Sequence, residues 1–208
     1  MIDKVRRGFD SRADNYDNPV TAFIGERELR AIRKLVPPGS TVLDYGCGTG
    51  RTTLDLLRRG CTVTAFDISP NMLALAEAKS MEMGFEAEFT TDASKLTGRT
   101  WPVITCIGVL DYYRDPLPLL KTLREHLQPA GWLVVTFPNA LSPLAWLYVL
   151  GSRFTVQSVA RTPNSARRSA AEAGFQVTAL SYAFPAIAPL GHTMVVGLQS
   201  ASQSATGQ

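Results

Sequence analysis

Residues 42–50 read Val-Leu-Asp-Tyr-Gly-Cys-Gly-Thr-Gly, and this short stretch decides the fold. A β-rich run at 41–45 ends in closely spaced glycines, and a helical pattern at 51–59 begins directly after them. Glycine has no Cβ, so the backbone of such a loop can approach a ligand closely. Open parallel sheets bind ligands beyond the carboxyl ends of their strands, where this loop falls. The stretch therefore predicts a strand, a ligand-binding loop and a helix in succession.

The alternation of strand and helix continues along the chain beyond the glycine loop. We predict strands at 41–45, 61–66, 86–91, 103–107, 131–137, 175–182 and 193–198, and helices at 20–36, 51–59, 70–84, 116–127, 143–150 and 163–173. Strands that alternate with helices build βαβ units and a parallel sheet. The last two strands are separated only by residues 183–191, too few for a helical crossover, so they should pair antiparallel. We therefore predict an α/β fold: a doubly wound, mostly parallel seven-stranded sheet with an antiparallel last strand and helices on both faces.

The charge of the chain is mild and unevenly placed. The net charge is +3, and the first 128 residues hold equal numbers of basic and acidic side chains. The excess lies beyond them, in Arg153, Arg161, Arg167 and Arg168 against a single acid, Glu172. A nucleic-acid-binding protein usually carries a denser basic stripe, so we expect no nucleic-acid partner. The arginines form either a solvated helix face or an anion-binding surface, and the sequence leaves both open.

The three cysteines, Cys47, Cys61 and Cys106, form no C-x-x-C pair and are odd in number. A reduced compartment explains them better than a disulfide framework. The first ten residues are charged and lack the apolar run of a signal peptide. The longest apolar run, 144–150, is far too short to cross a bilayer. We expect a cytoplasmic protein without an integral membrane segment.

The spacing of the glycines narrows the choice of ligand. A dinucleotide fingerprint, G-x-G-x-x-G/A, requires a small residue at position 51, which is Arg51 here. The glycines read G-x-G-x-G instead, which disfavours a nicotinamide or flavin dinucleotide. A P-loop is excluded because no Lys-Ser/Thr pair follows.

At this point the chain resembles the class I S-adenosylmethionine-dependent methyltransferases that act on small molecules. The resemblance runs from residue 9 to residue 198. It implies S-adenosylmethionine as the cofactor, with Asp44 orienting its methionine part and Asp67, at the end of the second strand, taking both ribose hydroxyls. A carboxylate suits that task because it can accept two charge-assisted hydrogen bonds from adjacent hydroxyls. The further cofactor residues that the resemblance implies are Gly46, Cys47, Gly48, Ile68, Asp92 and Ala93 near the adenine, and Ile107 with Gly108 after the fourth strand.

A segment before the sheet, residues 9–17, looks like the F-D-x-x-A-x-x-Y-D stretch that folds over the cofactor in small-molecule members. Tyr16 would then approach the methyl-donor end. A lid excludes water and so strengthens the electrostatics inside the site. The alternative is an amphipathic helix that only docks Phe9 on the core. We place one methyltransferase domain at 1–199, with lid helices at 1–36, an acceptor-side insertion at 138–165 and a disordered tail at 200–208.

The region on the acceptor side argues against a nucleic-acid base as substrate. The fourth strand is followed by Asp111-Tyr112-Tyr113, and the acid/Asn-Pro-Pro-aromatic motif of enzymes that methylate DNA amino groups is absent. The apolar stretch at 144–150 is open to three interpretations: a buried core helix, the wall of a pocket for an apolar acceptor, or peripheral membrane contact.

The candidate catalytic residues are His192, Tyr113 and Asp111, and His126 is discounted because its helix register points to solvent. A sulfonium donor leaves as a neutral group, so positioning does most of the work and a base is needed only for an acceptor such as a hydroxyl. We expect no metal site. The expected function is methyl transfer to oxygen, nitrogen or carbon of a small, partly apolar metabolite. The alternative is a non-catalytic protein that binds the cofactor or its demethylated product.

Overall fold

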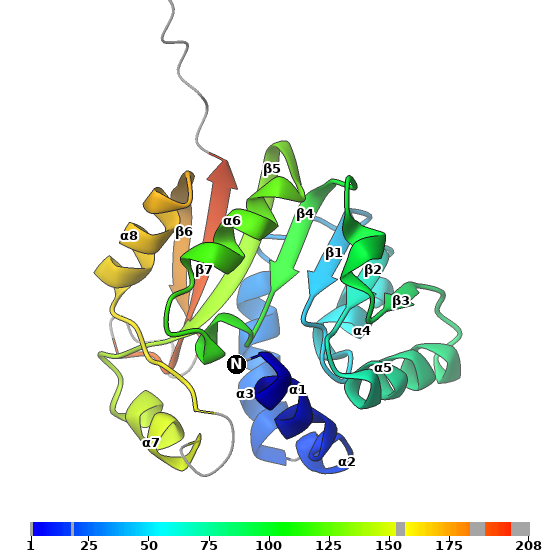
Figure 1. The fold of residues 1–208 in the computed structure, drawn as a ribbon, viewed down its shortest axis with the longest axis horizontal. Helices are drawn as coiled ribbons and strands as arrows, with labels where there is room; N and C mark the ends of the chain where they lie inside the picture. Colours follow the sequence, from blue (N-terminus) through cyan, green and yellow to red (C-terminus); the bar gives the residue numbers. More distant parts are fainter. Residues whose placement is uncertain (1, 18, 153–156, 184–189, 201–208) are drawn as a thin grey trace, which may run out of the picture.

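The computed structural model describes residues 2–17, 19–152, 157–183 and 190–200 (Figure 1). Its described part contains one seven-stranded sheet in the order β3-β2-β1-β4-β5-β7-β6. The strands are β1 (Thr41–Tyr45), β2 (Thr62–Phe66), β3 (Glu88–Thr90), β4 (Trp101–Cys106), β5 (Leu127–Pro138), β6 (Phe175–Tyr182) and β7 (Thr193–Ser200). Strands β1 to β5 run parallel, and β7 is antiparallel to both neighbours, β5 and β6. The predicted mostly parallel sheet with an antiparallel last strand is confirmed.

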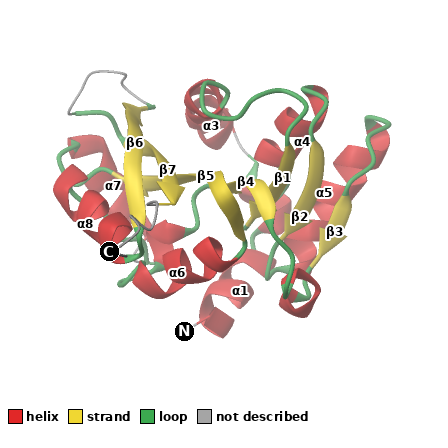
Figure 2. Cartoon of the chain, turned by 90° about the horizontal axis from the view of Figure 1, so that it is seen from above, coloured by secondary structure: helices red, strands yellow, loops and turns green. Residues whose placement is uncertain are grey.

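The helices cover both faces of this sheet (Figure 2). They are α1 (Ile2–Asp10), α2 (Ala13–Tyr16), α3 (Pro19–Ile32), α4 (Arg51–Arg58), α5 (Pro70–Glu82), α6 (Leu117–Glu125), α7 (Pro143–Ser152) and α8 (Pro163–Glu172). One core cluster joins α6 and α8 to the sheet through Leu120, Ala170 and Ile104. The other joins α3, α4 and α5 to its opposite face through Ile32, Leu56 and Leu73.

Alternating strand residues feed these two clusters. In β1, Val42 belongs to one cluster and Leu43 to the other, as the period of two in a strand requires. The sheet is thus buried on both sides, which is why its strands are rich in β-branched and apolar residues.

Most element boundaries differ from the predicted ones by one or two residues, and the clearest differences are these. Helix α3 ends at Ile32, because residues 33–36 form a turn ahead of Pro37. Strand β3 is shorter than predicted, since only residues 88–90 pair with β2 at this edge of the sheet. Strand β5 begins at Leu127, four residues early. Ser200 pairs with Phe175 in the sheet, so the tail predicted from position 200 is wrong for that residue, and 201–208 lie outside the described residues.

Helices α1, α2 and α7 lie beyond the carboxyl ends of the parallel strands. Helices α1 and α2 lie below β1 and β4 in Figure 1, and α7 lies below β5 and β7 at the same end. The core interpretation of the predicted helix at 143–150 is wrong, because α7 buries Ala145 but leaves Leu147 and four other large apolar side chains exposed.

Candidate active site

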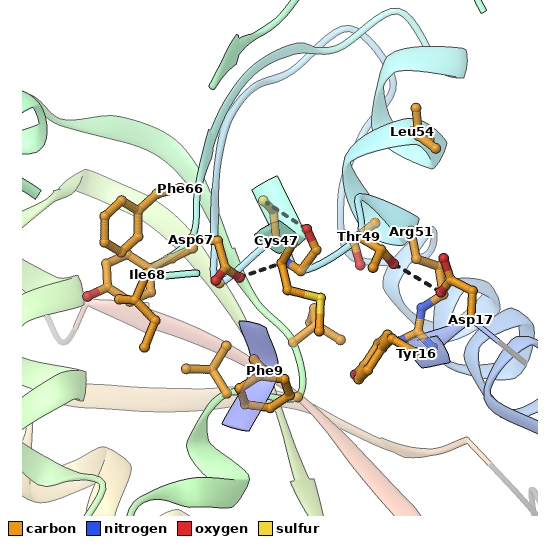
Figure 3. A pocket seen from close by; sticks show the side chains of 18 of the residues that line it. Phe9, Tyr16, Asp17, Cys47, Thr49, Arg51, Leu54, Phe66, Asp67 and Ile68 are labelled. Atoms are coloured by element: carbon orange, nitrogen blue, oxygen red, sulfur yellow. Dashed lines mark hydrogen bonds between the residues drawn. The ribbon is translucent and has the colours of Figure 1, made fainter. Parts of the chain in front are cut away.

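A cavity of about 400 Å³ opens where the glycine loop meets the lid helices. Its size falls within the range of ordinary small-molecule sites, roughly 300–1,000 Å³. Figure 3 shows Cys47 and Asp67 on one side of it and Phe9 and Tyr16 on the other. The predicted site residues that line it are Tyr16, Gly46, Cys47, Gly48, Asp67, Ile68, Ile107, Gly108 and Tyr113. The structure thus gathers residues from five separate parts of the chain around one space.

The glycine loop is held by the neighbouring strand. The N–H groups of Gly46 and Cys47 both donate to the carbonyl of Phe66, at 2.7 and 3.0 Å, and so tie the end of β1 to the end of β2. Gly46 has φ +78°, and a Cβ there would lie 2.2 Å from Cγ2 of Val109. Position 46 therefore tolerates only glycine without displacement of the loop after β4.

Asp67 ends β2 with its side chain at the cavity. Its Oδ2 accepts the N–H of Gly48 and its Oδ1 accepts the N–H of Ser69, each at 2.8 Å. Burial raises the pKa of Asp67, and the two backbone donors oppose that shift. A carboxylate offers about four acceptor positions, so two remain for a ligand. The geometry fits a vicinal diol, as the ribose of a nucleoside provides.

Asp44 lies below the loop and not at the cavity. Its side chain is 1% exposed and accepts hydrogen bonds from the hydroxyls of Thr53 and Thr105, at 2.6 and 2.8 Å. Burial raises the pKa of Asp44 to about 6, although these two hydroxyls lower it. The described contacts make Asp44 a support of the loop, and a role toward a cofactor stays a prediction.

Asp92 and Ala93 are exposed and do not line the cavity. Asp92 caps the short helix η1 (Ala93–Leu96) by accepting the N–H of Ser94 at 2.9 Å. The structure therefore does not bring the two residues expected near the adenine into the cavity.

The lid segment is fastened to the nucleotide side by polar contacts. Asp10 accepts the hydroxyl of Ser69 at 2.5 Å, and Asp17 accepts that of Thr49 at 3.0 Å. Lys79 of α5 forms an ion pair with Asp17. Residues 9–17 therefore close the cavity and do more than dock on the core.

Arg51 is a cavity residue that the sequence reasoning used only to exclude a dinucleotide. It lines the cavity, and its guanidinium donates to Glu28 of α3 at 2.6 Å. A Cβ at Gly25 would lie 2.0 Å from the Arg51 side chain, so a glycine in α3 makes room for it. Arg51 and Lys79 both line the cavity, and each is already paired with an acid, Glu28 and Asp17 respectively. The sequence signal for Arg51 was its place at the first turn of α4.

A polar cluster adjoins the cavity where η2 (Leu110–Tyr112), α7 and β7 meet. The hydroxyls of Tyr112 and Tyr148 share a hydrogen bond of 3.1 Å, and the Tyr148 ring meets the edge of His192 with centroids 5.5 Å apart. On its other side Tyr112 packs against Phe9 of the lid, with centroids 5.1 Å apart. Tyr112 thus connects Phe9 of the lid to Tyr148 of α7.

The two titratable candidates in this cluster are both buried, and neither lines the cavity itself. Burial raises the pKa of Asp111 to about 8, with the charge of Glu28 adding to the rise, so this acid is largely protonated at neutral pH. Its Oδ1 is buried without a hydrogen-bond partner. Burial lowers the pKa of His192, and its Nδ1 lies 2.9 Å from the hydroxyl of Thr193. Asp111 is therefore a protonated acid and His192 a neutral imidazole at neutral pH, and a catalytic role for either residue stays a prediction.

Two residues considered as catalytic candidates remain, Tyr113 and His126. Tyr113 lines the cavity, and its carbonyl accepts a hydrogen bond of 2.6 Å from Arg161. Burial raises the pKa of Tyr113, so it stays a phenol at neutral pH. His126 ends α6 with Nδ1 3.2 Å from the carbonyl of Arg99, away from the cavity, which agrees with its exclusion.

The sheet order, the glycine loop and the acid at the end of β2 together define an α/β methyltransferase of class I, the predicted class. The family model described as "Methyltransferase domain" matches residues 21–180. The chain belongs to this family.

Curated relatives agree with that family. The chain is 27% identical over 146 residues to the "Ubiquinone biosynthesis O-methyltransferase" of Xanthomonas axonopodis pv. citri (strain 306), which covers 68% of this chain and 61% of the relative. It is 31% identical over 134 residues to the protein of the same description in Xylella fastidiosa (strain 9a5c), which covers 62% and 54%. The chain thus spans about three fifths of the length of these relatives.

Solved structures agree with the fold. The magnesium protoporphyrin IX methyltransferase of Synechocystis PCC 6803 with bound SAH matches with a TM-score of 0.69 and 20% identity, over 96% of this chain and 94% of that one. The S-adenosylmethionine-dependent methyltransferase of Mesorhizobium loti matches with a TM-score of 0.64 and 18% identity, over 83% and 97%.

Within the described ranges no helix is both long and apolar enough to cross a membrane. The same part of the chain holds no cluster of three or more histidine, cysteine, aspartate or glutamate side chains that could bind a metal ion.

Proposed function

We propose that this chain transfers a methyl group from S-adenosylmethionine to an oxygen of a small, partly apolar metabolite, within one domain. The observation that carries the proposal is the cavity itself: Asp67 with two acceptor positions left, bare glycine backbone beside it, and Arg51 in the lining. These groups complement the ribose diol, the nucleoside and the amino-acid carboxylate of the cofactor. The descriptions of the curated relatives as O-methyltransferases support oxygen as the acceptor atom.

S-adenosylmethionine, when bound, supplies a methyl group on a sulfonium that leaves as a neutral thioether. The residues of the chain position the acceptor and handle its proton. His192 is our candidate base, because its lowered pKa keeps the imidazole neutral and able to take a proton from a hydroxyl. Tyr112 lines the cavity and, with its hydrogen-bond partner Tyr148, orients the acceptor, while buried Asp111 next to Tyr112 is a candidate positioning residue. The lid, fastened through Asp17, excludes water from the reacting pair.

The partners and the compartment follow from the same reasoning. We propose a small molecule and not a nucleic acid as acceptor, because Tyr112 and Tyr113 stand where base methyltransferases carry a proline pair. We also propose that the protein works in the cytoplasm, in keeping with its three unpaired, buried cysteines.

The test supplies methyl-labelled S-adenosylmethionine and a cell extract separated into lipid and aqueous fractions. We expect label in a compound from one of these fractions, transferred by the wild type and by Asp115→Asn, whose side chain is exposed and outside the cavity. His192→Gln should lower kcat by about 100-fold or more and abolish the acidic limb of the pH–rate profile. If the protein binds the cofactor but neither fraction takes up label, it is a binding protein and not an enzyme.

A further inference from the structure

Helix α7 turns an apolar surface toward solvent. It docks through Ala145, which is buried, and Val149, which is half-buried and lies one turn later on the same side. The side chains around the rest of its circumference are apolar and exposed: Leu144 (41%), Trp146 (57%), Leu147 (66%) and Leu150 (53%). A surface helix of a protein that meets only water carries polar side chains on that side. Residues 143–152 include no charged side chain.

Two exposed leucines from neighbouring loops extend this surface. Leu141 (44%) precedes α7, and Leu190 (48%) lies in the loop before β7. Asn139 joins the two loops, because its side-chain amide donates to the carbonyl of Gly191 at 2.8 Å. The indole of Trp146 is fixed by its N–H, which donates to the carbonyl of Ala140 at 2.9 Å. We call Leu141, Leu144, Trp146, Leu147, Leu150 and Leu190 the apolar patch.

The charges near the apolar patch suit an anionic surface. Between positions 129 and 171 the chain has no acidic residue. Helix α1, at the same end of the molecule (Figure 1), exposes Lys4, Arg6 and Arg7 against Asp3, and α2 beside it exposes Asp14. Basic side chains near a membrane of anionic lipids each add about 1 kcal/mol of attraction. Leucine and tryptophan on one side with nearby basic residues are typical of helices that lie in the lipid interface.

We propose that the apolar patch binds the surface of a bilayer that contains anionic lipids. The patch adjoins the acceptor side of the site, because Tyr148, also on α7, contacts Tyr112 and His192. A second copy of the chain on the patch would cover that side, whereas a bilayer would present apolar acceptors to it. This last argument rests on the proposed function; the binding of lipid does not.

The experiment uses the full chain without cofactor or acceptor, so its result is independent of methyl transfer. Vesicles of phosphatidylcholine, with and without phosphatidylglycerol, are titrated into the protein, and binding is measured by flotation and by tryptophan emission. Of the three tryptophans, Trp101 is buried and Trp132 is half-buried in β5, whereas Trp146 is exposed in the patch, so a blue shift that is lost in Trp146→Phe reports on the patch. We expect binding to the anionic vesicles and a weaker response with phosphatidylcholine alone.

Leu147→Asp should weaken binding by at least about tenfold, since it exchanges an inserted leucine for a charge. Met81→Asp is the matched control, because Met81 is equally apolar and exposed (72%) but lies on α5, and it should bind as the wild type does. Trp146→Phe should retain flotation and lose the blue shift. Thermal unfolding checks that each variant is folded.

Absence of binding by the wild type, or equal binding by the wild type and Leu147→Asp, would overturn the proposal. A dimer in light scattering that Leu147→Asp dissociates, without any vesicle binding, would assign the patch to a second copy instead.

Discussion

Asp67→Asn removes one acceptor and the negative charge while it keeps the shape of the side chain. In the wild type each carboxylate oxygen accepts one backbone N–H, from Gly48 or Ser69, and retains one position for a ribose hydroxyl. The amide nitrogen of asparagine cannot accept, so one hydroxyl loses its partner and the other loses charge assistance. A hydrogen bond to a charged group contributes about 1.5–3 kcal/mol, so we expect a loss of roughly 2–3 kcal/mol in cofactor affinity. This corresponds to a Kd about 30- to 150-fold higher.

Calorimetry with S-adenosylhomocysteine measures this change directly. The matched control is Asp115→Asn, which alters an exposed carboxylate outside the cavity and should change the Kd by less than about twofold. A 2′-deoxy analogue of the ligand tests the contact itself. It should bind the wild type more weakly, and Asp67→Asn should add little further loss, because both changes remove the same bond. An affinity for Asp67→Asn within threefold of the wild type would refute the assignment of Asp67 to the diol.

Three further predictions concern the lid, the buried acid and the loop. Asp17→Asn breaks the half-exposed ion pair with Lys79, so bound S-adenosylhomocysteine should dissociate about two- to fivefold faster in stopped flow, and high salt should remove the difference. Asp111 has a folded-state pKa above its unfolded value, so its contribution to stability is full below about pH 4 and falls until about pH 8. Asp111→Asn should therefore be more stable than the wild type at pH 8, by on the order of 2–4 kcal/mol in urea unfolding, and equal stability at that pH would contradict the buried, protonated state. Gly46→Ala places a Cβ against Val109 at positive φ and should cost about 2–5 kcal/mol of unfolding free energy; Val109→Ala in the same chain should restore part of it, and no restoration would exclude the clash as the cause.

The fold could be predicted because its signals are local. The runs at 41–45 and 175–182 match β1 and β6 to the residue, since each is β-rich and bounded by glycine or proline. The short β3 could not be delimited, because its extent depends on pairing with β2 alone. The end of α3 was misplaced for a related reason: apolar residues continue the helical pattern through Val36, but the chain turns before Pro37.

The candidate site was predicted in part. Asp67 and the loop glycines could be predicted because they come directly after β-rich runs, and the ends of such runs can be recognised in the sequence. Asp44 also lies near the end of a strand, so the sequence predicts it as a site residue equally well. In the structure, however, its carboxylate accepts hydrogen bonds from the hydroxyls of Thr53 and Thr105 below the loop. The protonation of Asp111 depends on its burial by segments that are distant in the sequence. The ion pair between Glu28 and Arg51 joins two residues that are 23 positions apart and lie on different helices. Such properties arise only after the chain packs. The sequence could not predict the exposure of α7 either, because a run of apolar residues does not indicate which side of the helix packs against the rest of the protein.

The double contact of Tyr112 has a kinetic consequence. Its ring packs against Phe9 of the lid, and its hydroxyl shares a hydrogen bond with Tyr148 of α7. If the N-terminal helices open, Tyr112 loses the contact with Phe9 that holds it in place beside Tyr148. A methyl acceptor that binds before the nucleoside would meet Tyr112 and Tyr148 without the support of the closed lid, whereas one that binds afterwards would meet them in the closed arrangement. We therefore expect ordered addition, with the nucleoside binding before the methyl acceptor.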